Sequence, residues 1–257
     1  MTARITSRQT DRIKQHAADA IRGLTKDGAQ RLIKRGDVFQ TRLKELALQL
    51  STDYYTPHFD NEAVAWIVEY AKKPEAEAWQ IVEGFRCNAR MAGVADTVKI
   101  HAEVQPGCTV KRDIPQMGPC WEDFKYLQGW NFPDQPTEHA LVSWISAPLP
   151  ESTEKNMSEQ AAVIASFKTE VGLPAWYDVS FGSVNHIGGM SLAHFNATGM
   201  DPFNSLVVRT DTCYADGGRL KLNWRRGRLY CGDWYWDEGR NSVLAVFVVG
   251  VVKALGR

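Results

Sequence analysis

One segment near the carboxyl-terminal end gathers the side chains best suited to contact a ligand. Residues 209–241 hold three Trp and three Tyr, with six Arg, four Asp, five Gly and two Cys. Tyr and Trp offer large, rigid contact areas, and Gly, Asn and Asp allow adaptable loops, which together are typical of a binding surface. The segment therefore predicts a ligand-binding patch, with structural packing of its aromatic residues as the alternative. The candidate ligand-binding residues are Asp211, Tyr214, Asp216, Asn223, Arg225, Arg228, Tyr230, Asp233, Trp234, Tyr235, Trp236, Asp237, Arg240 and Asn241.

The two cysteines of this segment could carry a different chemistry. Cys213 and Cys231 could pair with each other, bind a metal with a distant partner or supply a nucleophile, and free thiols are the simplest state. His186 and Asp211 form a second possible catalytic pair. An enzyme that uses Cys213, Cys231 or the His186–Asp211 pair is therefore the first alternative function.

The motifs of familiar metal, phosphate and serine sites are missing from the chain. His186 and His194 match no zinc-binding spacing. The segment from Gly182 to Gly189 contains glycines but no lysine, so it predicts turns before a helix rather than a phosphate-binding loop. No GxSxG motif is present. The leading expectation is a protein that is not an enzyme and that carries neither a metal nor a cofactor.

The charge of the chain is balanced overall but uneven along its length. Its 30 Lys and Arg against 30 Asp and Glu give no general argument for nucleic acid or membrane binding. Residues 1–50 carry 11 basic and five acidic side chains, whereas residues 51–85 carry two basic and seven acidic ones. Neighbouring helical segments of opposite sign most simply attract each other. A basic amino-terminal arm that binds nucleic acid is the second alternative.

The number of cysteines and the hydropathy of the chain indicate the compartment in which the protein is expected. The chain has five Cys, an odd number, and residues 1–14 contain no apolar region of a secretion signal. The longest apolar run, residues 242–255, is interrupted by Lys253 and is too short to span a bilayer. We expect free thiols in a cytoplasmic protein or in part of a virus particle, and no membrane span.

Hydrophobic periodicity predicts an α+β protein of two domains. Apolar residues recur at helical spacing over residues 8–50 and 61–85, which predicts a helical accessory domain at residues 1–92. Residues 93–257 change to strand-like and loop-like patterns and predict a second domain of two helices packed on antiparallel strands. Its helices are expected from Asn156, through a capping box with Glu159, to Gly172, and from Met190 to Ala197. Its strands are expected at residues 98–104, 141–145, 206–209, 219–224, 229–234 and 243–252, with turns at 226–227 and 238–239.

Residues 140–257 resemble a C-type lectin-like domain. The resemblance rests on two helices, the segments Asn204–Thr212 and Gly217–Leu222, a decorated loop, and a final strand that ends at Val252. More narrowly, the position of the decorated region is similar to that in the variable proteins of diversity-generating retroelements. In that family, copying errors at template adenines change ligand-facing residues encoded near the 3′ end of the gene, on a C-type lectin-like scaffold.

This resemblance implies a non-enzymatic binding protein with a variable region at about residues 205–252. Its ligand would be an unknown protein or glycan, and the amino-terminal helices could form a homo-oligomer. The calcium motifs of sugar-binding C-type lectins and the closely spaced cysteine pair of formylglycine-generating enzymes are absent. Framework-like positions are Leu220, Leu222, Leu229, Leu244, Val246 and Phe247, and Cys213, Arg226 and Cys231 join the candidate residues as variable-like.

Overall fold

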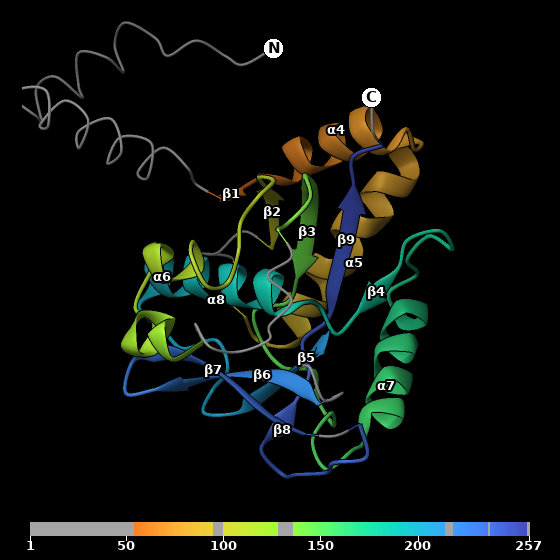
Figure 1. Ribbon diagram of the computed structural model, residues 1–257. Coiled ribbons are helices and arrows are strands. Elements are labelled where there is room, and N and C mark those ends of the chain that lie inside the picture. The colour runs from red at the N-terminus through yellow and green to blue at the C-terminus, as the bar shows by residue number, and fades with distance from the viewer. Residues whose placement is uncertain (1–53, 95–99, 128–135, 214–217, 236, 256–257) are drawn as a thin grey trace, which may run out of the picture. The chain divides into compact units, whose positions relative to one another are not determined.

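The computed structural model describes residues 54–94, 100–127, 136–213, 218–235 and 237–255, with residues 233–235 described by their backbone alone. These residues belong to one compact unit, Asp53–Arg257, in which helices accompany two sheets (Figure 1). The protein is therefore of mixed α+β class, as predicted. The helices predicted between residues 8 and 50 lie outside the described residues.

Five antiparallel strands form the larger sheet, here called sheet A, in the order β1-β2-β3-β9-β4. All five residues of the central strand β3 are buried, because Val142 and Trp144 face one core cluster and Leu141 faces another. The strand predicted at residues 141–145 is thereby confirmed to within one residue. The bounds are β1 Tyr55–Pro57, β2 His101–Val104, β3 Ala140–Trp144, β4 Val179–Ser180 and β9 Val249–Lys253.

One face of sheet A is covered by helices α4 (Asp60–Ala71), α5 (Glu75–Met91) and α7 (Met157–Glu170). Their apolar faces share a core cluster with strand residues such as Leu141 and Val252. Residues 60–91 are therefore part of the same compact unit as the sheets, whereas the sequence pattern placed a domain boundary at residue 92. Helical periodicity shows that a face is apolar, but it does not show whether that face packs on other helices or on a sheet.

The other face of sheet A packs on helix α8 (Val184–Thr198), with the smaller sheet B beyond it (Figure 1). Sheet B has the order β7-β6-β5-β8, in which β8 runs parallel to β5 and the other pairs are antiparallel. Two short helices complete this side. The bounds are α6 Ile114–Met117, the 3-10 helix η1 Trp121–Leu127, β5 Val207–Cys213, β6 Arg219–Arg225, β7 Arg228–Tyr235 and β8 Leu244–Ala245.

The aliphatic run near the carboxyl terminus crosses from one sheet to the other. The prediction of one strand over residues 243–252 is wrong, because β8 belongs to sheet B and β9 to sheet A. Val246, Phe247 and Val248 join the two strands and are fully buried, with Phe247 in one core cluster and its two neighbours in the other. An unbroken apolar run signals burial on all sides, and a buried crossing segment produces the same signal as a strand.

Helix α8 begins earlier than the pattern predicts. Its N-cap is Ser183, whose Oγ accepts a hydrogen bond from the backbone N–H of His186, so the expected start at Met190 is wrong. Of the glycines expected to form turns, Gly188 and Gly189 lie inside the helix, whereas Gly182 precedes it with a φ of 72°. A Cβ on Gly189 would come within 2.2 Å of the Tyr55 ring, so glycine allows β1 and the helix to approach closely. The predicted end is confirmed, since Gly199 caps the helix with a φ of 72°.

Helix α7 begins as predicted. The side chain of Asn156 accepts from the backbone N–H of Glu159, and the Glu159 carboxylate accepts from the backbone N–H of Asn156. Within the described part of the chain, none of the helices combines the length and apolar character needed to cross a membrane.

Candidate functional site

The β6–β7 hairpin carries the centre of the predicted ligand-binding segment. Its residues alternate between the core and the outer face of sheet B, as a strand requires. Leu220, Leu222 and Leu229 are fully buried on the inner side, and Trp224 packs against the same core. This confirms the predicted direction of the three odd-numbered polar residues Arg219, Lys221 and Asn223, which point away from that core.

The turn of the hairpin and the strand ends beside it bring five predicted or variable-like residues together. Arg226 and Gly227 have φ values of 50° and 72°, which is the pattern of a type I′ turn, and the predicted turn is confirmed. Arg225 pairs with Arg228 directly across the strands, and Asn223 pairs with Tyr230. The arginines are exposed, whereas Asn223 and Tyr230 are half-buried. We call Arg225, Arg226, Gly227, Arg228 and Tyr230 the hairpin tip.

A stack of side chains orients the hairpin tip. The guanidinium carbon of Arg225 lies 3.7 Å from the centroid of the Tyr230 ring. The Tyr126 ring, from η1, stacks on Tyr230 with centroids 5.6 Å apart and planes at 14°. Tyr126 is held in turn because its hydroxyl donates to the carbonyl of Cys231 at 2.9 Å. Gly232 leaves room for the stack, since a Cβ there would come within 2.7 Å of the Tyr230 ring.

The opposite end of the hairpin, the hairpin base, is made of Arg219 with its contacts and the loop Asp237–Asn241. Arg219 donates to the carbonyl of Asp211 at 2.6 Å, to the carboxylate of Asp237 at 3.0 Å and to the thiol of Cys213 at 2.9 Å. The hydrogen bond that Arg219 donates to Asp237 raises the pKa of Arg219. Desolvation raises the pKa of the Asp211 carboxyl, although the residue as a whole stays exposed.

The loop at the hairpin base is fastened to the start of α7. Arg240 forms an ion pair with Glu159, with nitrogen–oxygen distances of 2.8 Å. The backbone N–H groups of Met157 and Glu154 donate to the carbonyls of Asp237 and Asn241. Three of the predicted ligand-binding residues, Asp237, Arg240 and Asn241, therefore take part in contacts that hold the loop.

Two cationic side chains on the outer side of sheet B are buried. Arg209 on β5 and Lys221 on β6 are register partners with 1% and 4% of their surfaces exposed. Arg209 donates to the carbonyl of Gly239 at 2.6 Å, which joins this layer to the loop of the hairpin base. Sequence reasoning did not single out either residue, because arginine and lysine on the polar side of a strand are ordinarily exposed.

Six of the predicted ligand-binding residues have no described side chain. Tyr214, Asp216 and Trp236 lie outside the described residues. Asp233, Trp234 and Tyr235 are placed on β7 by their backbone. The described predicted residues are thus divided between the two ends of one hairpin, and their side chains do not form one contiguous contact network.

Burial limits which of the two cysteines could react with a substrate. Cys231 is fully buried in the core, so it is wrong as a variable-like surface residue and its thiol cannot meet a substrate. Cys213 is exposed and contacts Arg219. Across the described part of the chain, the cysteines are free thiols, and no group of three His, Cys, Asp or Glu side chains is arranged to hold a metal ion.

His186 lies in a separate cavity at the start of α8. The cavity measures about 250 Å³ and is also lined by Thr137, Asn185, Thr212 and Lys253. Burial, and then the charge of Lys253, lower the pKa of His186 to about 4, so the ring is neutral at pH 7. Among the described residues no hydrogen bond joins His186 to Asp211, and the proposed catalytic pair is not formed.

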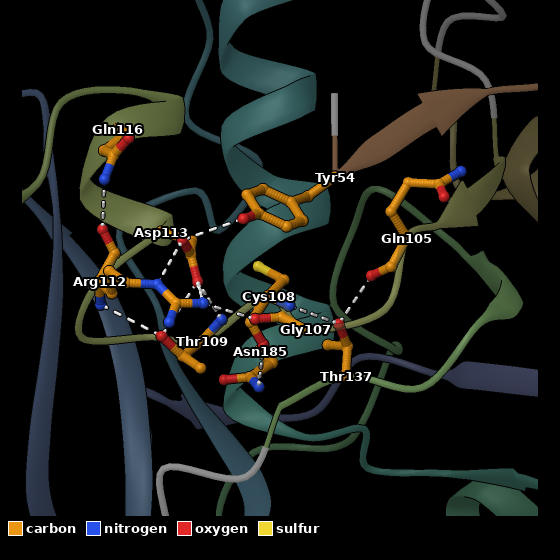
Figure 2. Close-up of polar contacts among 10 residues, drawn as sticks. All are labelled: Tyr54, Gln105, Gly107, Cys108, Thr109, Arg112, Asp113, Gln116, Thr137 and Asn185. Carbon is orange, nitrogen blue, oxygen red and sulfur yellow. Dashed lines mark hydrogen bonds and ion pairs between the residues drawn. The ribbon is translucent and has the colours of Figure 1, made fainter. Parts of the chain in front are cut away.

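A dense polar network around Asp113 lies near this cavity (Figure 2). The Asp113 carboxylate accepts hydrogen bonds from Tyr54, Thr109 and Arg112 at 2.7–3.1 Å. Burial opposes ionisation of Asp113, but the hydrogen bonds from Arg112 and Thr109 prevail and lower its pKa. The acceptor positions are used inside the protein, so the network holds the loop between β2 and α6 rather than a ligand.

Tyr126 is the site residue that sequence reasoning missed. It lies about a hundred residues before Tyr230 in the chain, and no spacing rule connects the two. Comparison with protein-family models, curated proteins and solved structures finds nothing that matches this chain. Function is therefore inferred from the chemistry and geometry of the hairpin residues themselves.

Proposed function

We propose that the protein is a non-enzymatic binding protein whose ligand contacts the exposed and half-buried residues of the β6–β7 hairpin. In this proposal the scaffold is C-type lectin-like and the surface is diversified by a retroelement. The site of action is inside a cell or on a virus particle.

One observation carries the proposal: residue type and burial agree along the segment. The six framework-like positions, from Leu220 to Phe247, each have 0% of their surface exposed. Variable-like positions such as Arg225, Arg228 and Arg240 are exposed. A surface that tolerates substitution needs a core that does not depend on it, and this hairpin divides its residues in that way. Among the variable-like positions whose side chains are described, the buried Cys231 is the exception.

The order of the elements supports the choice of scaffold. Helices α7 and α8 precede the strands of sheet B, and the chain then returns through β9 into the middle of sheet A. This succession of two helices, a decorated hairpin and a buried return strand is the arrangement that the resemblance implies.

Sequencing the 3′ end of the gene across a natural population tests the proposal. We expect substitutions at adenine-containing codons for half-buried, outward-facing positions such as Asn223 and Tyr230, and no substitutions at the buried Leu222 and Leu229. An invariant near-copy of the segment should lie nearby in the genome. Substitutions spread evenly over buried and exposed positions, without a near-copy, would reject the retroelement origin.

Cysteine chemistry at Cys213 is the second candidate function, favoured by its exposure and by its contact with Arg219. Reactive cysteines commonly lie beside cationic groups. The test is the rate of alkylation at neutral pH, with the exposed Cys87 as an internal reference thiol. Equal rates for the two thiols would dismiss the candidate, whereas a fast Cys213 that slows in Arg219→Gln would support it.

Nucleic-acid binding through residues 1–50 stays a prediction, since those residues lie outside the described part. It predicts binding to DNA or RNA that weakens steeply as salt is added. A salt-insensitive interaction would argue against it.

A further inference from the structure

The hairpin tip concentrates positive charge that its surroundings do not neutralise. Arg225, Arg226 and Arg228 are exposed, and no carboxylate oxygen of the described residues lies within 4.0 Å of their guanidinium nitrogens. Other arginines on the described surface do have such partners: Arg90 pairs with Glu83, and Arg219 pairs with Asp237. The tip arginines therefore differ from these arginines in pairing and not in residue type.

The placement of three arginines at the hairpin tip is unfavourable for the local stability of the hairpin. Arg225 and Arg228 are direct cross-strand partners, and like charges in that relation destabilise a sheet. Arg226 has a φ of 50°, in the left-handed region where a type I′ turn favours Asn or Gly. Violations of local rules that gather at one place are expected where a function needs them.

The stack beneath the arginines prepares them for a partner. Tyr230 contacts both Tyr126 and Arg225, and the guanidinium carbon of Arg225 lies 3.7 Å from the centroid of the Tyr230 ring, so the stack holds the guanidinium over the ring. A planar guanidinium fixed in this way can offer two parallel N–H donors to a carboxylate and loses less side-chain entropy on binding.

We propose that the hairpin tip binds a compact acidic segment on a protein partner, whose carboxylates engage Arg225 and Arg228. This inference rests on the proposed binding function and names the chemistry of its ligand. Arg and Tyr are also the residue types that dominate protein–protein binding energy.

The distribution of charge favours an acidic protein segment over an extended polyanion. At the hairpin base, Arg219 and Arg240 are already paired with the carboxylates of Asp237 and Glu159, and the exposed Glu238 adds a further negative charge. The base lies about 20 Å from the tip along strands that rise roughly 3.3 Å per residue. A nucleic acid or sulfated polysaccharide that followed the hairpin would meet these carboxylates. A short acidic cluster can bind the tip without reaching them.

The test measures binding of a fluorescein-labelled hexaglutamate peptide to the full chain by anisotropy. The variant R225Q/R228Q removes both charges and keeps similar side-chain size. The control K72Q/R90Q removes two charges from exposed positions on the α4 and α5 side of the protein. We expect the affinity of R225Q/R228Q to fall roughly tenfold or more, since each lost charged hydrogen bond weakens binding substantially. The control should bind like the wild type, and all melting temperatures should agree.

Three results would overturn the inference. The wild type does not bind the peptide, or R225Q/R228Q binds it as well as the wild type does. Alternatively, a heparin hexasaccharide or a dodecathymidylate loses more affinity than the peptide in R225Q/R228Q, which would assign the tip to a polyanion.

Selection of a random peptide library on the wild-type protein separates failure of this inference from failure of the binding function. Peptides that need Tyr230, shown by lost binding in a folded Tyr230→Ala variant, establish hairpin binding. If they are neutral and bind R225Q/R228Q normally, the binding function stands and the acidic partner is rejected. Acidic peptides that lose binding in R225Q/R228Q support the inference, and the recovery of no hairpin-dependent peptide counts against both proposals.

Discussion

The two ends of the β6–β7 hairpin use the same residue types for opposite purposes. At the hairpin base, Arg219 and Arg240 are paired with Asp237 and Glu159, and the loop is fastened to α7. At the hairpin tip, Arg225 and Arg228 face each other without a described carboxylate nearby. Amino-acid composition alone therefore does not identify a binding residue. What distinguishes the ends is whether the fold supplies a partner.

The largest expected effect comes from removing the scaffold that both ends share. Leu222→Asp should destabilise the protein by about 4 kcal/mol or more, because it places an unpaired charge in a fully buried position. Both ends should then be lost together in one unfolding transition, followed by circular dichroism. Leu255→Asp, at a position with 62% of its surface exposed, is the control and should leave stability unchanged.

Acid should weaken the body of the protein while leaving the tip charged. Burial lowers the pKa of His101 from 6.5 to about 3, and the pKa of His186 is lowered to about 4. The unfolded chain therefore binds protons first, so stability is full above pH 6.5 and falls as the pH drops towards these values.

For His101 alone, the free energy of unfolding should be about 2 kcal/mol lower at pH 5 than at pH 7. Urea unfolding at the two pH values measures the difference, and His186 adds to it in the same direction. Arginines keep their charge throughout this range, so peptide binding at the tip should persist while the protein remains folded. An unfolding free energy that does not change between the two pH values would show that these histidines are accessible to protons in the folded state.

The stack at the tip can be broken without removing a charge. Gly232→Ala would place a Cβ within 2.7 Å of the Tyr230 ring and should destabilise the protein by about 1–3 kcal/mol. Gly188→Ala is the matched control, because its Cβ would meet only ordinary contacts at 3.7 Å or more. If both variants melt at the same temperature, the packing of Tyr230 against Gly232 is not tight.

The smallest effects compare the two ends directly. Arg219→Gln should cost about 1 kcal/mol, because it removes the hydrogen bonds to Asp237 and to the carbonyl of Asp211. Arg228→Gln should cost nothing, or stabilise the hairpin by about 0.5 kcal/mol, because it relieves the repulsion from Arg225. Denaturant midpoints for the two variants measure the contrast, and equal losses would remove the distinction between base and tip.

The sequence alone determined those features that depend on neighbours in the chain. The alternation of Leu220, Leu222 and Leu229 with polar residues predicted the hairpin and its buried side. The capping box at Asn156 and Glu159 predicted the start of α7, and Arg226-Gly227 predicted the turn. Each of these signals is local, because periodicity, capping and turn geometry act over a few residues.

The contacts between side chains that are far apart in the sequence became visible in the tertiary structure alone. It placed Tyr126 against Tyr230, fitted Tyr55 against Gly189 inside a helix, and divided the final apolar run between two sheets. It also decided which arginines have carboxylate partners and which do not. Packing selects contacts by the shapes of side chains and their distances in space. A pattern along the chain indicates only whether a residue is buried or exposed, and it does not identify the residue that it contacts.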